Sequence, residues 1–253
     1  MQVQMRKERV PSSEVGAHVG EMITVMGWLH SWRELGGVSF LVLRDAWGTI
    51  QAVAETAEEL EPLRILEAGV ESVISLSGRV LAMPQAPGGV ELHELRVEVI
   101  SPVREVPVVP INKPRLSAHL GTLLDHAAVT NRHPTRRAIL RLGAGAMRAF
   151  RELLNERHFT EIQTPKLVEA ATEGGANVFE VNYFGRRAYL AQSPQFYKQM
   201  MVGVFERVYE VGPVFRAEHH DTTRHTNEYV SLDVEMGFIE DHISHHCWPL
   251  SAN

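Results

Sequence analysis

The sequence is poor in cysteine, with Cys247 alone among 253 residues. One cysteine allows no disulfide within the chain and no cysteine metal cluster, which suits a reducing cytoplasm. Apolar runs of transmembrane length are also missing, and the first seven residues lack the apolar core of a secretory signal. We therefore expect a cytoplasmic protein with no membrane partner.

The sequence also has no excess of basic residues. It contains 31 acidic and 25 basic residues, and the formal net charge is −6. This balance does not favour a nucleic-acid partner, but it does not exclude one, because local patches govern such binding. The hydrophobic content of 44% supports a packed core, and the length suffices for one large domain or two modest ones.

The first 105 residues contain short β-like runs separated by turn signals. The runs are Met22–Trp32, Val38–Arg44, Gly48–Ala54, Val70–Met83 and Val90–Ile100. A helix-like insert near Ala57–Ala68 falls between the third and fourth runs, with Leu60, Leu63 and Leu66 at helical spacing. Five strands with a helix in this place are typical of an OB-fold barrel. A small β-sandwich is the alternative.

A proline-rich stretch follows, Val106–Pro114, with three prolines. Proline removes backbone donors and stiffens the chain, so residues 106–130 are predicted to form a hinge after the barrel. Pro134–Arg157 then reads as a long amphipathic helix. Its apolar stripe comprises Ile139, Leu142, Ala146, Ala149, Phe150 and Leu153.

Residues 208–238 read as two alternating strands joined by a polar loop. Apolar side chains point to one face of each strand, which predicts one buried face and one polar face. The polar face collects Arg216, Glu218, Asp233 and Glu235. It can be a solvated surface or a floor for a ligand. The loop, His219–His225, is rich in groups that bind anions and favours the ligand floor.

Three segments of this hairpin, Phe215–Glu218, Thr223–His225 and Leu232–Met236, resemble motif 2 of class II aminoacyl-tRNA synthetases. The resemblance is closest to aspartyl-tRNA synthetases of the archaeal and eukaryotic type. It implies an all-β OB-fold barrel over 1–105, followed by part of an α+β catalytic domain with an antiparallel sheet over 131–242. The helix and strand ending at Pro165 resemble motif 1, which implies a homodimer.

The resemblance extends to Gln192–Gln199, a serine–proline helix start. It implies that Gln195 and Lys198 bind L-aspartate, with Asp233 taking the ammonium and Glu173 at the tip of a lid loop. From the residues alone, Gln195 and Lys198 form an i, i+3 pair that could be simply exposed. The loop around Glu173 could equally be a plain turn.

The implied reaction forms aspartyl-adenylate from aspartate and ATP with Mg²⁺, and then esterifies tRNA. Arg216 is the implied catalytic residue, holding the α-phosphate and the attacking carboxylate. The implied ATP-binding residues are Arg216, Glu218, Arg224, His225 and Tyr229. We predict no metal site built by the chain itself. The family's fixed charges work by positioning and neutralisation.

The barrel is implied to bind the anticodon of tRNA(Asp). Phe40 matches the aromatic position that stacks on the central base, although it could be a core residue, and Gln51 matches a polar position that reads base edges. His30 and Pro84, or Pro87, fall where the family contacts the third anticodon base. Histidine and proline there resemble the form that also charges tRNA(Asn).

The last residues, 243–253, show neither helical nor strand periodicity and do not match the family. A family member is expected to continue with motif 3, further acidic residues for Mg²⁺ and an arginine that clamps aspartate. We therefore hypothesise a frameshifted or truncated chain. The alternative function is a tRNA-binding fragment without catalytic activity.

Overall fold

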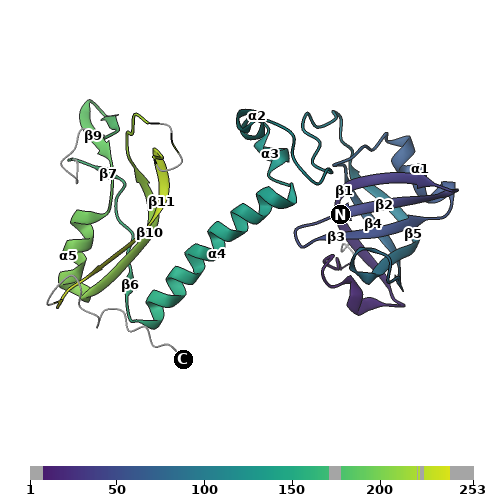
Figure 1. Ribbon diagram of the computed structural model, residues 1–253, viewed down its shortest axis with the longest axis horizontal. Helices are drawn as coiled ribbons and strands as arrows, with labels where there is room; N and C mark the ends of the chain where they lie inside the picture. The colour runs from purple at the N-terminus through teal and green to yellow at the C-terminus, as the bar shows by residue number, and fades with distance from the viewer. Residues whose placement is uncertain (1–7, 171–177, 221, 223–224, 240–253) are drawn as a thin grey trace, which may run out of the picture. The chain divides into compact units, whose positions relative to one another are not determined.

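The computed structural model describes residues 8–170, 178–220, 222 and 225–239. The chain divides into two compact units, Met1–Arg137 and Ala138–Asn253 (Figure 1). Within the described residues, no helix combines the length and the apolar character needed to cross a membrane.

The first unit is built around a closed five-stranded barrel with the order β1-β2-β3-β5-β4. Its strands are β1 (Met22–Leu35), β2 (Val38–Arg44), β3 (Thr49–Ala54), β4 (Val73–Ala82) and β5 (Val90–Ser101). Helix α1 (Ala57–Ile65) lies between β3 and β4, and a capping box of Thr56 and Glu59 starts it. Two short 3-10 helices, η1 (Val15–His18) and η2 (Pro87–Gly89), complete this part. The predicted OB-fold barrel is confirmed.

The barrel encloses a continuous apolar core. Leu60 and Leu63 of α1 are buried in it, as the helical spacing predicted. Leu66 shares that spacing but is 47% exposed, because α1 ends one residue before it. The fully covered side chains of the strands include Val25, Leu29, Leu41, Leu43, Ile74, Leu76, Val80 and Leu92.

The segment after the barrel contains two short helices, α2 (Leu120–Asp125) and α3 (Ala127–Thr130). Its end is tied to the barrel by charged groups. Arg132 Nη1 donates to Glu71 Oε2 at 2.9 Å, and Arg137 Nη1 donates to the backbone carbonyl of Asp45 at 3.1 Å. Arg132, just before α4 (Pro134–Glu156), and Arg137, in its first turn, are therefore held against the barrel surface.

The second unit contains two three-stranded sheets. One has the order β11-β10-β6 and the other the order β7-β9-β8. The strands are β6 (Thr160–Glu161), β7 (Leu167–Val168), β8 (Glu180–Tyr183), β9 (Arg186–Leu190), β10 (Arg207–Phe215) and β11 (Glu228–Met236). β10 and β11 are antiparallel, and α5 (Gln195–Phe205) packs on both. A small core joins Leu154 of α4 to Phe159, Tyr209 and Val211.

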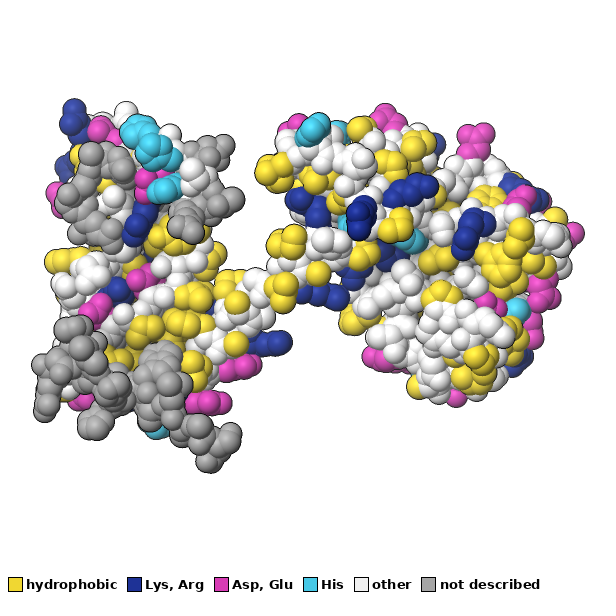
Figure 2. Space-filling model, in the orientation of Figure 1, with side chains coloured by type: hydrophobic (Ala, Val, Ile, Leu, Met, Phe, Trp, Pro, Cys, Tyr) yellow, Lys and Arg dark blue, Asp and Glu magenta, His cyan; other side chains and the backbone are white. Residues whose placement is uncertain are grey.

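The predicted apolar faces of α4 and β11 are only partly buried. Val234 and Met236 pack against the small core, but Val230 is 51% and Leu232 is 42% exposed. On α4 the buried contacts come from its C-terminal part, whereas Ile139 is 62% exposed. Figure 2 shows hydrophobic side chains on the visible surface of this unit. Periodicity identifies an apolar face, but it does not say whether another element covers that face.

Candidate functional site

The register of β10 and β11 defines the polar face of the hairpin. Directly opposed residues of an antiparallel pair share a face, and Glu210 opposes Asp233 while Val214 opposes Tyr229. Alternation then places Tyr229, Asp233 and Glu235 on this same face. Tyr229 and Asp233 are four residues apart, roughly 13 Å along the strand. The predicted polar strip therefore runs along one face of the sheet.

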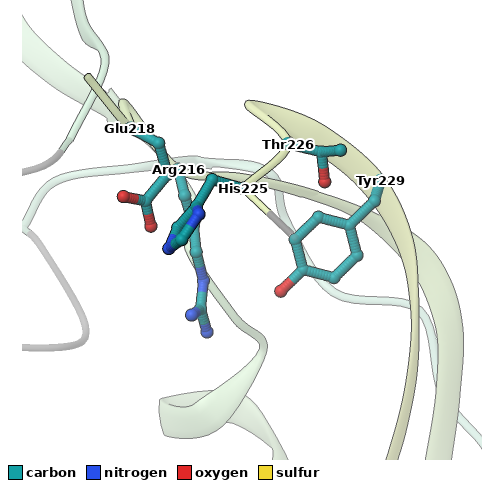
Figure 3. A pocket seen from close by; sticks show the side chains of 5 residues that line it. All are labelled: Arg216, Glu218, His225, Thr226 and Tyr229. Atoms are coloured by element: carbon teal, nitrogen blue, oxygen red, sulfur yellow. The ribbon is translucent and has the colours of Figure 1, made fainter. Parts of the chain in front are cut away.

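At one end of this strip the side chains surround a cavity of about 500 Å³ (Figure 3). Arg216, His225 and Tyr229 point toward a common space in the close-up. The cavity is lined by Arg216, Glu218, His225, Thr226 and Tyr229. Four of these five are predicted ATP-binding residues. Thr226 was missed, and its place directly after His225 is the only signal that the sequence offers for it. Arg224 lies outside the described residues.

Backbone hydrogen bonds hold the base of this cavity. Arg216 N donates to the carbonyl of Asn227 at 2.9 Å, and Glu218 N donates to the carbonyl of Arg216 at 2.8 Å. The His225 ring is oriented by Nδ1, which lies 2.7 Å from Thr222 Oγ1. A guanidinium, an imidazole, a carboxylate and an aromatic ring thus converge. This combination suits a ligand with both a phosphate and an aromatic base.

Farther along the strip, Lys198 of α5 is buried against acidic residues. Its Nζ lies 3.0 Å from Asp233 Oδ1 and 3.3 Å from Glu235 Oε2. Lys198 is 6% exposed, so the two carboxylates compensate the cost of burying its charge. Gln195 lies one turn earlier, at the start of α5, with its backbone N donating to Ser193 Oγ. Glu173 lies outside the described residues.

Glu210 is a buried acid on this face that sequence reasoning did not single out. It is 1% exposed and accepts from Thr164 Oγ1 at 2.7 Å, Thr164 N at 3.1 Å and Lys166 Nζ at 2.8 Å. A Cβ at Gly212 would lie 3.1 Å from its Oε1. Glu210 therefore anchors the chain that follows β6 to the floor of the site. Its place in an alternating polar face gives no signal of this burial, which depends on the segment that packs against the strand.

The barrel carries three of the predicted anticodon-binding residues, His30, Phe40 and Gln51, on β1, β2 and β3. Ser31, Val42, Gln51 and Glu91 form one row across the strands, and Phe40 follows two residues from Val42 on the same face. Phe40 is half-buried and does not belong to the barrel core. Gln51 Nε2 donates to Glu91 Oε1 at 2.6 Å, and the carbonyl oxygen of Gln51 takes no part in this bond.

His30 lies at a β-bulge of β1, between Leu29 and Ser31. Its Nδ1 is 3.1 Å from Arg44 Nη1. Burial first, and then the charge of Arg44, lower the pKa of His30 from its usual value. Pro84 is exposed in the turn after β4, and Pro87 begins η2 in the same connection. His30, Phe40 and Gln51 thus share one surface.

Comparisons with known proteins agree with this geometry. A family profile described as "tRNA synthetases class II (D, K and N)" matches residues 120–247, about half of the chain. The chain belongs to this synthetase family. A second profile, "OB-fold nucleic acid binding domain", matches residues 23–100 and covers most of the barrel. The resemblance drawn from the hairpin motifs is confirmed.

Curated relatives of this synthetase chain are described as "Aspartate--tRNA(Asp/Asn) ligase". The protein of Deinococcus radiodurans is 50% identical over 234 residues, which are 92% of this chain and 52% of the relative. That of Thermus thermophilus is 49% identical over 233 residues, covering 92% and 53%. The synthetase chain spans about half the length of these curated relatives.

Solved structures give the same result for the synthetase fold. Asparaginyl-tRNA synthetase from Pyrococcus horikoshii, complexed with asparaginyl-adenylate, matches with a TM-score of 0.84 at 34% identity. The match covers 92% of this chain and 54% of that one. A putative aspartyl-tRNA synthetase from Leishmania major matches with a TM-score of 0.82 at 31% identity, covering 95% and 50%.

Proposed function

We propose that this chain takes part in the ATP-dependent ligation of L-aspartate to tRNA(Asp) and tRNA(Asn) through an aspartyl-adenylate. The observation that carries the proposal is the polar strip of the β10–β11 hairpin. It has a cavity suited to a nucleotide at one end and the ion pair of Lys198 and Asp233 farther along. The relatives named for both tRNAs support the choice of RNA.

In this proposal the cavity residues position ATP. Arg216 holds the α-phosphate and the attacking carboxylate of aspartate, and neutralises the charge that develops between them. Tyr229 stacks on adenine, Glu218 accepts from its amino group, and His225 and Arg224 reach the outer phosphates. The family's chemistry needs little beyond this alignment of the two substrates.

Lys198 favours aspartate over asparagine as the amino acid. Its ammonium complements the β-carboxylate of aspartate, whereas a neutral amide needs no such cation. Asp233 then binds the ammonium group of the substrate. The ion pair between Lys198 and Asp233 is thus replaced by one ion pair from each residue to the substrate. Gln195 and Glu173 complete the pocket in this proposal.

Mg²⁺ is proposed as a companion of ATP rather than a resident ion. Among the described residues, no group of three or more His, Cys, Asp or Glu side chains is arranged to hold a metal. Phosphate oxygens and water would supply most of its ligands.

A cytoplasmic homodimer is part of the same proposal. The helix that resembles motif 1 carries exposed apolar side chains, Ile139 at 62% and Leu142 at 74%. A second copy of the chain would bury them. Sedimentation of the chain at increasing concentration checks this, and an unchanging monomer would contradict it.

Aspartate-dependent exchange of pyrophosphate into ATP, without tRNA, tests the catalytic proposal directly. Exchange by this chain supports the catalytic proposal, and Arg216→Ala should lower that exchange by a factor of about 10²–10³, since one electrostatic stabiliser is removed. Arg148→Ala is the matched control, because Arg148 is 77% exposed on α4 and far along the chain from the cavity residues. Equal rates in both variants would contradict the role of Arg216.

A second candidate function is tRNA binding without adenylate formation. The observation in its favour is that the described lining of the cavity comes from the β10–β11 hairpin and its loop alone. Binding of tRNA without any aspartate-dependent exchange would support this candidate. Exchange would reject it.

A further inference from the structure

Lys166, in the connection between β6 and β7, is a second lysine on the polar face of the β10–β11 hairpin. Its Nζ lies 2.8 Å from Glu210 Oε1 and 3.1 Å from Thr164 Oγ1. A Cβ at Gly212, the next residue of β10 on the polar face, would lie 3.4 Å from the same Nζ. Lys166 therefore lies over the floor of the proposed site, although it is not among the residues proposed to bind a substrate.

The partner of Lys166 belongs to a group of three carboxylates on this floor. Glu210 directly opposes Asp233 of β11, and Glu235 follows Asp233 two residues along the same face. Directly opposed residues have Cβ atoms roughly 4.5–5.5 Å apart, and like charges at this distance are destabilising. Lys166 pairs with Glu210. Lys198 pairs with both Asp233 and Glu235. Three carboxylates and two ammonium groups thus leave an excess of negative charge.

Burial makes this balance of charge important. Glu210 is 1% exposed and Lys198 is 6% exposed, and the side chain of Lys166 is 21% exposed. Salt and water screen buried charges much less than exposed ones, so Lys198 responds to the charge carried at Lys166. Without Lys166, Lys198 alone of these two lysines would face all three carboxylates. It would then be held more strongly by the floor, and the floor would repel a further carboxylate.

We propose that Lys166 is a positioning residue that favours aspartate over asparagine, because its pairing with Glu210 leaves Lys198 available to the β-carboxylate of the substrate. The inference rests on the proposed function, in which Lys198 leaves Asp233 for that carboxylate. Aspartate carries a net negative charge, whereas asparagine is neutral overall. Extra negative charge on the floor therefore penalises aspartate more than asparagine. Lys166 acts through its neighbours and does not itself touch the substrate.

Binding of L-aspartate and of L-asparagine to the full chain, measured by calorimetry, tests the proposal. Lys166→Met removes the charge and keeps a side chain of similar bulk. It should weaken aspartate about tenfold and asparagine less than about threefold, so the ratio of the two affinities falls. Lys166→Arg keeps the charge and should leave this ratio within about threefold of the wild-type value. An unchanged ratio in Lys166→Met would overturn the proposal.

Glu210→Gln separates an effect of charge from a loss of structure. The amide keeps an oxygen that can accept from Thr164 and removes one negative charge from the floor. The affinity ratio should then rise about three- to tenfold in favour of aspartate, which is opposite to the change in Lys166→Met. The double variant Lys166→Met/Glu210→Gln loses one charge of each sign, and its ratio should return to within about threefold of the wild type. A fall of the ratio in Glu210→Gln would overturn the proposal, even if Lys166→Met does not fold.

The matched controls are Arg187→Met and Glu180→Gln. These residues form an ion pair between β9 and β8, with side chains 79% and 53% exposed. Both variants remove one charge from the same unit, and neither should change the affinity ratio, because exposed charges are screened. A change as large as that in Lys166→Met would show that the ratio follows the net charge of the chain, and would overturn the proposal.

Pyrophosphate exchange gives a second measurement of Lys166→Met. The KM for aspartate should rise about tenfold while the KM for ATP stays within about twofold, a split that a general loss of structure does not produce. Equal rises in both KM values would overturn the proposal. If the wild-type chain binds neither amino acid, the proposed function fails together with this inference. If it binds aspartate and the variants keep the wild-type ratio, only this inference fails.

Discussion

The barrel and the hairpin sheet differ in how far their apolar side chains are covered by other parts of the chain. In the barrel every strand has a neighbour on both sides, and the core side chains of all five strands are covered. In the sheet of β11, β10 and β6, the edge strand β11 leaves Val230 and Leu232 exposed in the described structure. In a closed barrel every strand is paired on both sides and the inner faces of the strands cover one another. An open sheet depends on neighbouring elements to cover its edges and its apolar face.

The same difference separates the two proposed binding surfaces. The polar groups on the barrel face are backed by buried charges, Arg44 behind His30 and Glu91 beside Gln51. In the hairpin site, Lys198 has its partners on the floor itself, and the loop side chains are exposed. The hydrogen-bonding groups on the barrel face are thus held in fixed orientations by buried charged residues. In the proposed function, the charges of the hairpin site exchange partners when a substrate enters.

The largest expected effect on the barrel side is that of Glu71→Ala. Glu71 accepts two hydrogen bonds from the buried Arg44, at 2.7 and 2.8 Å. Removing this buried carboxylate leaves the Arg44 guanidinium without these bonds, and we expect the free energy of unfolding to fall by about 3–5 kcal/mol. Urea unfolding followed by tryptophan fluorescence measures it, since this guanidinium lies over the ring of Trp28. Glu34→Ala is the control, because its ion pair with Arg64 is exposed and worth less than about 1 kcal/mol. Equal losses would contradict a buried network.

Because the barrel core is buried and β11 is partly exposed, a leucine-to-alanine substitution should lower the free energy of unfolding by different amounts in the two regions. Leu76→Ala in the barrel core should lower the free energy of unfolding by about 2–5 kcal/mol. Leu232→Ala should cost less than about 1 kcal/mol, because that side chain is 42% exposed. Chemical denaturation of both variants makes the comparison. A large loss in Leu232→Ala would mean that another surface covers β11 in solution.

Acid should weaken the barrel through Asp45 and Glu71. Burial tends to raise the pKa of both, but hydrogen bonds from Ser12, Gly48 and Trp47 to Asp45, and from Arg44 and Arg132 to Glu71, outweigh it and lower the pKa. A carboxyl with a lowered folded-state pKa contributes stability above its unfolded pKa, about 4, and loses it as the pH falls further.

We therefore expect the free energy of unfolding to be steady from pH 7 to about 5 and to fall below that. Urea titrations at several pH values measure the trend. Asp45→Asn serves as the comparison, since it removes one titrating group and should flatten the decline. A stability that stays constant down to pH 3 would show that these pairs do not form in solution.

The smallest expected effect is that of Gln51→Leu on RNA binding. Loss of one hydrogen bond to a base should weaken anticodon stem-loop binding by about 0.5–1.5 kcal/mol, and the leucine also removes the donor to Glu91 Oε1. Filter binding of labelled stem-loop RNA gives the value. Gln163→Leu, an exposed position in the other unit, should bind like the wild type. Unchanged affinity in Gln51→Leu would remove this residue from the interface.

Much of the architecture follows from local pattern. Alternation and turn signals located all five barrel strands and the helix between the third and fourth, because period two and glycine-rich turns are local properties of the chain. The motif around Arg216 and the serine–proline start of α5 likewise identified residues that meet on one face. These motifs can be recognised in the sequence because each is a continuous segment.

The tertiary structure decided what covers each face and which groups meet across the sequence. It buried Glu210 against Lys166, left Leu232 exposed and placed Arg44 behind His30. It also oriented the amide of Gln51 through Glu91, forty positions away. Periodicity assigns a side chain to a face, but burial and hydrogen-bond partners depend on distant segments that fold against it. These properties therefore arise only when the chain is folded.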